Sequence, residues 1–271
     1  MGQVVHTLPE GEAICGVTSL DNEIFLVRPK VRDQVEVYDV ITYRLQRCLT
    51  VPNISSITDM TSCKYCHCLY ISDHTVECVH RLDSDGAATQ WPVNDKPTSL
   101  SVNAAHNVIV TCYRVCKIKE FSLHGDLLRQ LTLPDDDITL LHTIQSRSGE
   151  FIVCHGWPGD RISRVCMISA DGRHIVHLDV GQRSSDIGQQ TSPIHLAVDD
   201  YENVLVADTF NHRVTLLSPT LSFMREVVSN DKLKWVPLRL YLDIQRRRLY
   251  VADCERKNDK WTAGRVVVFS V

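Results

Sequence analysis

The sequence contains no apolar run approaching ~18 residues, the length that a helix needs to cross a membrane. Its first eight residues, Met1-Gly-Gln-Val-Val-His-Thr-Leu8, lack the basic n-region and the long apolar segment of a signal peptide. Position 6 is a histidine rather than Ser or Thr, so a myristoylation signal is not expected either. We therefore expect no contact with a membrane and a cytoplasmic location.

Several catalytic signatures are also missing. The chain has no Walker loop, no His-Glu-x-x-His zinc motif and no Ser-His-Asp order, and Gly156-Trp-Pro-Gly159 forms a turn rather than a phosphate cradle. An excess of positive charge is absent as well, because the net charge is −4 and the pI is near 6.3. These absences favour a binding function, so the chain is predicted not to be an enzyme and to need no cofactor.

Eleven cysteines are present, and without a secretory signal we expect them to be reduced. Most lie in apolar runs, where cysteine acts as a small buried hydrophobe: Cys15, Cys48, Cys112, Cys154 and Cys166. The segment Cys63-Lys-Tyr-Cys-His-Cys68 is different, because its thiols crowd a turn. Three interpretations stay open for it: free thiols, a disulfide formed on oxidation, or a zinc site completed by Cys78.

What the chain does contain is a repeat. Short β-branched runs centred on equivalent valines or isoleucines recur at intervals of 39 to 53 residues: Val27, Ile71, Val110, Val153, Val206 and Val251. The clearest copy, Ile194 to Leu217, reads as three strands joined by two polar turns. A period of roughly 40–45 residues with four strands is typical of a propeller blade.

Six such blades use the whole chain, so we predict one all-β domain over residues 1–271, a six-bladed β-propeller of four-stranded antiparallel blades. The last repeat ends after its third strand, while the residues from Gly2 to Leu8 form a strand without a partner. We expect this N-terminal strand to complete the last blade and close the ring, which removes the free sheet edges.

The segment Asp208-Thr-Phe-Asn-His-Arg-Val214, preceded by Ile194-His-Leu-Ala-Val-Asp199, resembles the NHL repeat. The resemblance extends more weakly over all six units, and it implies a six-bladed propeller similar to the C-terminal domains of tripartite-motif (TRIM) proteins. In those proteins the propeller binds protein or RNA, and a separate RING domain transfers ubiquitin. The chain has no RING, B-box or coiled coil, so a part in a ubiquitin-ligase system would depend on another segment or protein.

The residues that end the six second strands should lie around the axis: Arg28, Asp73, Cys112, His155, Asp208 and Asp253. Such a ring could bind a metal or a cationic ligand. The alternative, which we favour, is that each carboxylate binds its own strand 2–3 loop and the basic residue of the third strand. Asp208 would then pair with Arg213, and Asp253 with Arg265.

Resemblance to propeller enzymes suggests a metal-dependent lyase or hydrolase as a further alternative. Peptide-amidating lyases hold zinc with histidines over the axis, and His155 and His195 could lie there. The position matching His195 is Arg239 in blade six, Ser99 in blade three and, by spacing, Leu141 in blade four. His142 would point to the other face of its strand, which leaves too few zinc ligands. Asn103 and Asp59 are likewise too few for the calcium site of propeller lactonases.

Basic residues gather late in the chain, with ten Lys or Arg against five Asp or Glu from 231 to 265. This makes RNA the alternative partner, with Trp235, Tyr241 and Trp261 as stacking residues. The charges divide between the two ends of the propeller, however. Arg246, Arg247 and Arg248 belong to a strand 1–2 turn, whereas Arg256, Lys257 and Lys260 belong to a strand 2–3 loop.

The longest loops are His155–Ser163, Asp253–Gly264 and Gly181–Ser192, and all three fall on the face that carries the strand 2–3 loops and the blade connections, here called the 2–3 face. Elaborated loops carry function, so we predict that this face binds a protein partner. The predicted contact residues are Trp157, Arg161, Arg164, Arg213, Trp261 and Arg265, with His155, Asp208 and Asp253 beside them. The oligomeric state does not follow from the sequence.

Overall fold

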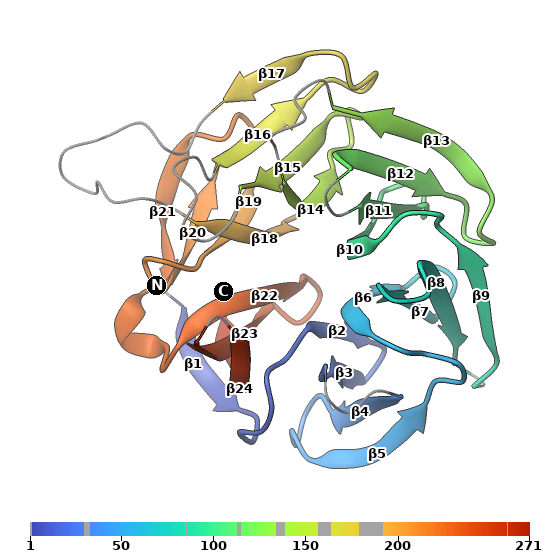
Figure 1. Cartoon of the computed structure of the whole chain (residues 1–271). Helices are drawn as coiled ribbons and strands as arrows, with labels where there is room; N and C mark the ends of the chain where they lie inside the picture. The colour runs from blue at the N-terminus through green and yellow to red at the C-terminus, as the bar shows by residue number, and fades with distance from the viewer. Residues whose placement is uncertain are drawn as a thin grey trace.

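The structure is a computed structural model, and it describes residues 2–29, 33–84, 86–112, 115–133, 139–156, 164–178, 192–258 and 260–271. Its described strands form six four-stranded antiparallel sheets arranged around one axis (Figure 1). The first strand of each blade lies innermost and the fourth lies outermost. The predicted six-bladed β-propeller is therefore confirmed.

The blades follow one another in chain order. Blade one has β2 (Gly16–Leu20), β3 (Glu23–Val27), β4 (Gln34–Asp39) and β5 (Leu45–Thr50). Blade two has β6 (Ile57–Cys63), β7 (Cys68–Asp73), β8 (Cys78–Asp83) and β9 (Ala88–Pro92). Blade three has β10 (Pro97–Val102), β11 (Val108–Cys112), β12 (Lys117–Phe121) and β13 (Leu127–Thr132). Blade four has β14 (Leu140–Gln145), β15 (Phe151–His155), β16 (Arg164–Ile168) and β17 (Ile175–Leu178). Blade five has β18 (Pro193–Val198), β19 (Val204–Asp208), β20 (Arg213–Leu217) and β21 (Phe223–Val228), followed by the 3-10 helix η1 (Asn230–Lys232).

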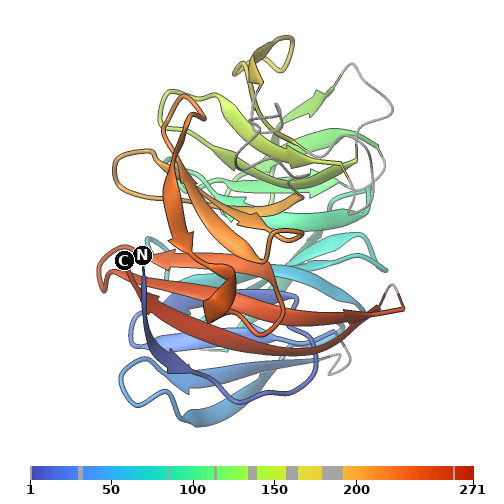
Figure 2. The ribbon, with the colours of Figure 1, turned by 90° about the vertical axis from the view of Figure 1, so that its left-hand side faces the viewer.

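The last blade is completed by the start of the chain. It contains β22 (Val236–Asp243), β23 (Arg248–Lys257) and β24 (Lys260–Ser270), and β1 (Gln3–Thr7) pairs antiparallel with β24. Beyond β1, the Leu8 amide donates to the carbonyl of Val266 at 2.8 Å, and the two ends of the chain lie side by side (Figures 1 and 2). The predicted ring closure is thus confirmed.

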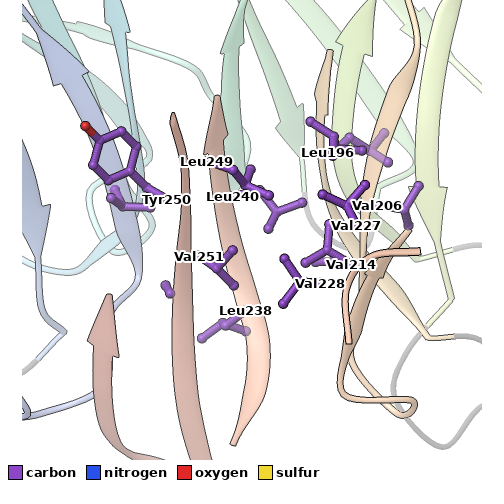
Figure 3. Close-up of a cluster of buried hydrophobic side chains, with 14 of the residues drawn as sticks. Leu196, Val206, Val214, Val227, Val228, Leu238, Leu240, Leu249, Tyr250 and Val251 are labelled. Carbon is purple, nitrogen blue, oxygen red and sulfur yellow. The ribbon is translucent and has the colours of Figure 1, made fainter. Parts of the chain in front are cut away.

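The core lies between neighbouring blades, because each sheet buries β-branched and leucine side chains against the next sheet. Figure 3 shows this packing between blades five and six, where Leu196 and Val206 face Leu240 and Val251. Tight turns join the third and fourth strands in blades three and four, where the amides of Gly125 and Gly172 donate to the carbonyls of Ser122 and Ser169. At one of them Gly125 has φ +94°, and a Cβ there would lie 2.6 Å from the ring of Trp91. Only glycine fits that position.

Two expectations about the chain's surface are corrected. The segment Asp253–Gly264 is mostly not a loop, because β23 and β24 continue as a long hairpin in which Arg256 pairs with Trp261 (Figure 2). Cys48 is exposed on the outer strand β5 rather than buried, while Cys15, Cys112, Cys154 and Cys166 are buried as expected. All eleven cysteines are free thiols.

No helix within the described ranges is long and apolar enough to cross a membrane.

Candidate active site at the propeller axis

A β-bulge recurs at the start of the innermost strand in blades two to six. The pairing with the second strand skips one residue in each of these strands, between Ile57 and Asp59 in β6 and between Leu140 and His142 in β14, for example. A bulge places two residues of one strand opposite one residue of its partner and turns the next side chain. The same register shift precedes Ser99, His195 and Arg239.

The bulge brings one polar side chain from each of these five blades to the same level at the axis. The members of this axial ring are Asp59, Ser99, His142, His195 and Arg239, and Gly16 stands at the matching position of blade one, where the register is regular. The prediction that Leu141 matches His195 and that His142 points away is therefore wrong. Leu141 is the extra residue of the bulge, and His142 takes the ring position.

Three ring members can hold a metal ion. One ligand atom from each of Asp59, His142 and His195 lies within 4.8 Å of the others, and all three residues are buried. The imidazoles of His142 and His195 lie with ring centroids 3.8 Å apart, and His195 Nε2 is 3.8 Å from Asp59 Oδ2. In the described part of the chain no other set of three His, Cys, Asp or Glu residues meets this spacing. The site is thus built from three different blades.

Both histidines are neutral near pH 7. Burial is the main cause that holds the pKa of His142 and of His195 well below the usual value of 6.5, and the charge of Arg239 acts in the same direction on each. The Nδ1 atom of His142 has no hydrogen-bond partner within the protein, although it is buried. A hydrogen bond with the backbone of Leu100 raises the His142 pKa and so works against the burial. The buried Nδ1 atom therefore remains available to a ligand.

Arg239 reaches from blade six past blade one and binds Asp59 of blade two. Its Nε lies 3.3 Å from Asp59 Oδ1 and donates to the carbonyl of Cys15 at 2.8 Å, while Nη2 donates to the carbonyl of Thr58 at 2.9 Å. The side chain thereby joins blade six to blades one and two. Burial raises the pKa of Asp59, and the charge of Arg239 opposes this rise. The Leu100 amide donates to Asp59 Oδ2 at 2.9 Å and fixes the carboxylate.

The site is nearly closed from solvent. The side chains of His195 and Arg239 keep 8 % and 14 % of their surface exposed, while that of Asp59 keeps 1 %. The Ser99 hydroxyl is also buried without a hydrogen-bond partner in the protein. Two unpartnered polar atoms in one buried ring are unusual, because such groups ordinarily bind protein or ligand. The ring therefore has free capacity for a bound ion or a small polar group.

The carboxylates at the ends of the second strands have a different role. Asp208 Oδ2 accepts from Arg213 Nε at 2.9 Å, and Asp253 Oδ2 accepts from Arg265 Nε at 2.8 Å, as the favoured alternative predicted. These aspartates also accept backbone amides from the segment that enters the blade, such as Trp235 N on Asp253 at 2.7 Å. Asp73 binds the amides of Ser55 and Ser56 in the same way. Sequence reasoning missed these linker contacts, which make each aspartate a clamp between strand and linker.

Blade one reverses the charges of this clamp. Arg28 takes the aspartate position, its Nε bonds Glu36 Oε1 at 2.8 Å, and its Nη1 donates to the linker carbonyl of Glu12. Arg28, Asp73, Asp208 and Asp253 therefore each join their second strand to other segments of the blade, and none of the six second-strand ends belongs to the metal-capable group. His155 ends β15 opposite Leu140 and does not belong to the metal-capable group.

The remaining predicted site residues divide into two groups. Arg164, Arg213, Trp261 and Arg265 are partly exposed near the 2–3 face, and their contact with a partner stays a prediction. Trp157 and Arg161 lie outside the described residues.

The two calcium candidates do not share a site. Asn103 follows the far end of β10 and binds Glu120 and Gln145, whereas Asp59 lies at the start of β6.

No family model matches the chain, and no curated protein matches it in sequence. Solved structures do match it in fold. Virginiamycin B lyase from Staphylococcus aureus superposes with a TM-score of 0.64 at 8 % identity, covering 97 % of this chain and 98 % of that one. A streptogramin B lyase gives a TM-score of 0.65 at 10 % identity, over 98 % of this chain and 88 % of that one. A Bacteroides caccae protein of unknown function gives 0.66 at 14 % identity, over 87 % and 84 %.

These identities establish the fold alone, and the finer resemblance to NHL repeats stays a prediction. The expectation that the chain is not an enzyme is nevertheless corrected, because the fold that the chain shares with two lyases does not exclude catalysis. That expectation treated a propeller without the familiar catalytic motifs as a binding platform, and two propellers that match this chain almost end to end are lyases. An acidic, two imidazole and one cationic side chain are buried together at the axis, and titratable groups with shifted pKa values tend to cluster at functional sites.

Proposed function

We propose that this propeller is a metal-dependent lyase or hydrolase whose centre is formed by Asp59, His142 and His195. The observation that carries the proposal is the convergence of one carboxylate and two neutral imidazoles from three blades, with His142 Nδ1 left without a hydrogen-bond partner in the protein. Zinc favours nitrogen and oxygen ligands, and three protein ligands leave a coordination position open. A metal held there would polarise a substrate oxygen or activate a water molecule.

The other ring members suit a polar substrate. Arg239 is held rigidly by the carbonyls of Cys15 and Thr58, so its charge is fixed toward the ring and favours an anionic group. The unpartnered Ser99 hydroxyl can bond a substrate oxygen. Metal binding has a local cost, because the Leu240 amide donates to His195 Nδ1 at 3.3 Å and this bond would be lost if the tautomer changed. A neutral hydrogen bond of that kind contributes about 1 kcal/mol, which a bound metal ion can outweigh.

The direct test is metal content. After incubation with zinc and dialysis, the protein is expected to retain about one zinc ion per chain by elemental analysis. The double variant His142→Ala with His195→Ala should retain none, while His124→Ala, which changes an exposed turn histidine, should bind like the unaltered chain. Virginiamycin B, the substrate named for one structural neighbour, is the first compound to assay, followed by simple esters. Zinc retention equal in the double variant and the unaltered chain would refute the proposal.

A second candidate function concerns protein binding at the 2–3 face, and it is compatible with catalysis at the axis. The supporting observation is a cluster of tryptophans and cations on blade six. Lys234 Nζ lies 4.3 Å from the centroid of Trp235, and Arg256 Cζ lies 5.8 Å from that of Trp261 on the β23–β24 hairpin. Tryptophan and arginine dominate binding hot spots. A surface of this kind suits the binding of a protein partner, which the resemblance to TRIM propellers implies.

Replacing Trp235 and Trp261 together by alanine is expected to abolish co-purification of proteins that associate with the immobilised chain in an extract. The replacement Tyr201→Ala, which removes an exposed aromatic side chain from the 1–2 turn of blade five, serves as the control. An unchanged set of associated proteins in the double variant would count against this face. RNA would replace protein as the partner class if a single-stranded oligonucleotide binds and its affinity falls roughly 10³-fold between about 50 and 200 mM salt.

A further inference from the structure

A thiol cluster lies in the turn between β6 and β7, at the end of the propeller opposite the 2–3 face. Cys66 Sγ is 3.2 Å from Cys68 Sγ and 3.6 Å from the hydroxyl of Tyr70. Cys66 is partly exposed, whereas Cys63 and Cys68 are buried as the facing residues at the ends of β6 and β7. The three thiols do not reach the mutual spacing of the metal-capable group at the axis, so the geometry favours a pair over a metal site. Cys78, expected to complete such a site, bonds His80 instead.

The surroundings of Cys66 stabilise its thiolate. Burial raises the pKa of Cys66, but hydrogen bonds with Cys63, Cys68 and Tyr70 and the nearby charge of Arg81 outweigh it, so the pKa is below the usual 9.0. Burial raises the pKa of Cys63, and that of Cys68 to about 12. The partly exposed thiol of Cys66 is therefore expected to react more readily than the buried thiols of Cys63 and Cys68.

We propose that Cys66 is a peroxide-sensitive residue that forms a reversible disulfide with Cys68. In the first step the Cys66 thiolate attacks one peroxide oxygen, the O–O bond breaks and hydroxide leaves, which gives a sulfenic acid. In the second step the sulfur of Cys68 attacks that of Cys66, the S–O bond breaks, and water leaves with the Cys68 proton. The two thiols lose two electrons and two protons, and hydrogen peroxide is reduced to two water molecules. The second step is intramolecular, so a buried Cys68 can take part.

The backbone permits this bond. His67, the single residue between the two cysteines, has φ +48°, which bends the chain and brings its neighbours together. The sulfur atoms must approach from 3.2 Å to a bond length of about 2.05 Å, so the turn must move by roughly 1 Å. The same turn contacts three other blades. Lys64 Nζ lies 3.2 Å from Asp243 Oδ1 in blade six, the ring of Tyr65 stacks on that of His106 in blade three at 4.2 Å, and His67 lies 3.3 Å from Asp21 in blade one. Oxidation would therefore alter contacts between blades.

The test uses the full chain with the exposed Cys48 replaced by serine, to avoid bonds between molecules. After exposure to hydrogen peroxide, alkylation and digestion, mass spectrometry should find a bond between Cys66 and Cys68 that dithiothreitol removes. Adding Cys68→Ser should leave a sulfenic acid at Cys66 that dimedone captures, and adding Cys66→Ser should abolish both products. Cys63→Ser should leave the disulfide intact.

Alkylation before oxidation provides a second measurement. Cys66 should react with iodoacetamide on the order of tenfold faster than Cys63 or Cys68, because each unit of pKa changes the thiolate fraction about tenfold. A disulfide that persists in the Cys68→Ser chain, or a folded chain in which dimedone never labels Cys66, would overturn the proposal. Neither result bears on zinc binding at the axis, so the two proposals fail separately.

Discussion

Replacing Arg239 by methionine is expected to lower the free energy of unfolding by about 3–5 kcal/mol, because it leaves the buried Asp59 carboxylate without its charge partner. The same change removes the hydrogen bonds to Cys15 and Thr58, which tie blade six to blades one and two. Chemical denaturation at pH 7 measures the loss. Methionine keeps much of the arginine side chain's length, so the effect of volume is limited.

A second substitution separates charge from packing. The double variant Asp59→Asn with Arg239→Met should be more stable than the sum of the two single changes predicts, because neither partner is then left charged and alone. A coupling near zero in this cycle, or an Arg239→Met chain as stable as the unaltered one, would show that the ion pair contributes nothing to the fold.

Zinc affinity should move in the opposite direction. Arg239 places a positive charge beside Asp59, 3.3 Å from its Oδ1 atom, and this charge repels a divalent ion at the ring. At about 5 Å and an effective dielectric constant of about 20, a unit charge and a divalent ion repel each other by roughly 7 kcal/mol. The Arg239→Met chain is therefore expected to bind zinc up to about 10⁵-fold more tightly, as measured by competition with a chelator. Weaker binding would mean that Arg239 positions Asp59 rather than opposing the ion.

Removing residues 1–8 is expected to have an effect as large as the whole stability of the chain. It deletes β1, exposes the edge of β24, and removes the buried Leu8, whose amide bonds Val266. Burial of a leucine contributes roughly 1.5–3 kcal/mol and each of the lost hydrogen bonds about 1 kcal/mol, against a typical total of about 5–15 kcal/mol. The truncated chain should lose its cooperative thermal transition and aggregate through the open edge.

Two controls make this result specific. Val5→Ser alters a side chain that is 40 % exposed and should change stability by less than about 0.5 kcal/mol. A synthetic peptide of residues 2–8 added to the truncated chain should restore part of the transition by pairing with β24. A truncated chain that melts at the same temperature as the full chain would show that closure by β1 does not stabilise the ring.

Much of the architecture could be predicted from sequence because it depends on local pattern. Alternating β-branched runs around Val206 and Val251, with polar turns between them, predict strands and their count without knowledge of distant contacts. The pairs of Asp208 with Arg213 and of Asp253 with Arg265 were also predictable, since each joins adjacent strands of one blade.

The axial ring could not be predicted in the same way. Spacing alone assigned Leu141 to the ring, because a bulge changes the face of a strand without changing its apolar character. The contact of Arg239 with Cys15 depends on closure of the ring, which makes the first and last blades neighbours, and 224 residues separate these two in the chain. The linker amides on Asp253 likewise form only once two segments come together in three dimensions.

The bulge that precedes five of the six ring positions has a consequence for how such a protein can evolve. Each ring position belongs to a different repeat. The same backbone bulge turns the side chain toward the axis, whether the residue is Asp59, Ser99 or His142. The chemistry of the axial ring can therefore change by single substitutions, without an insertion or a new loop, while the structure of the surrounding sheets stays the same.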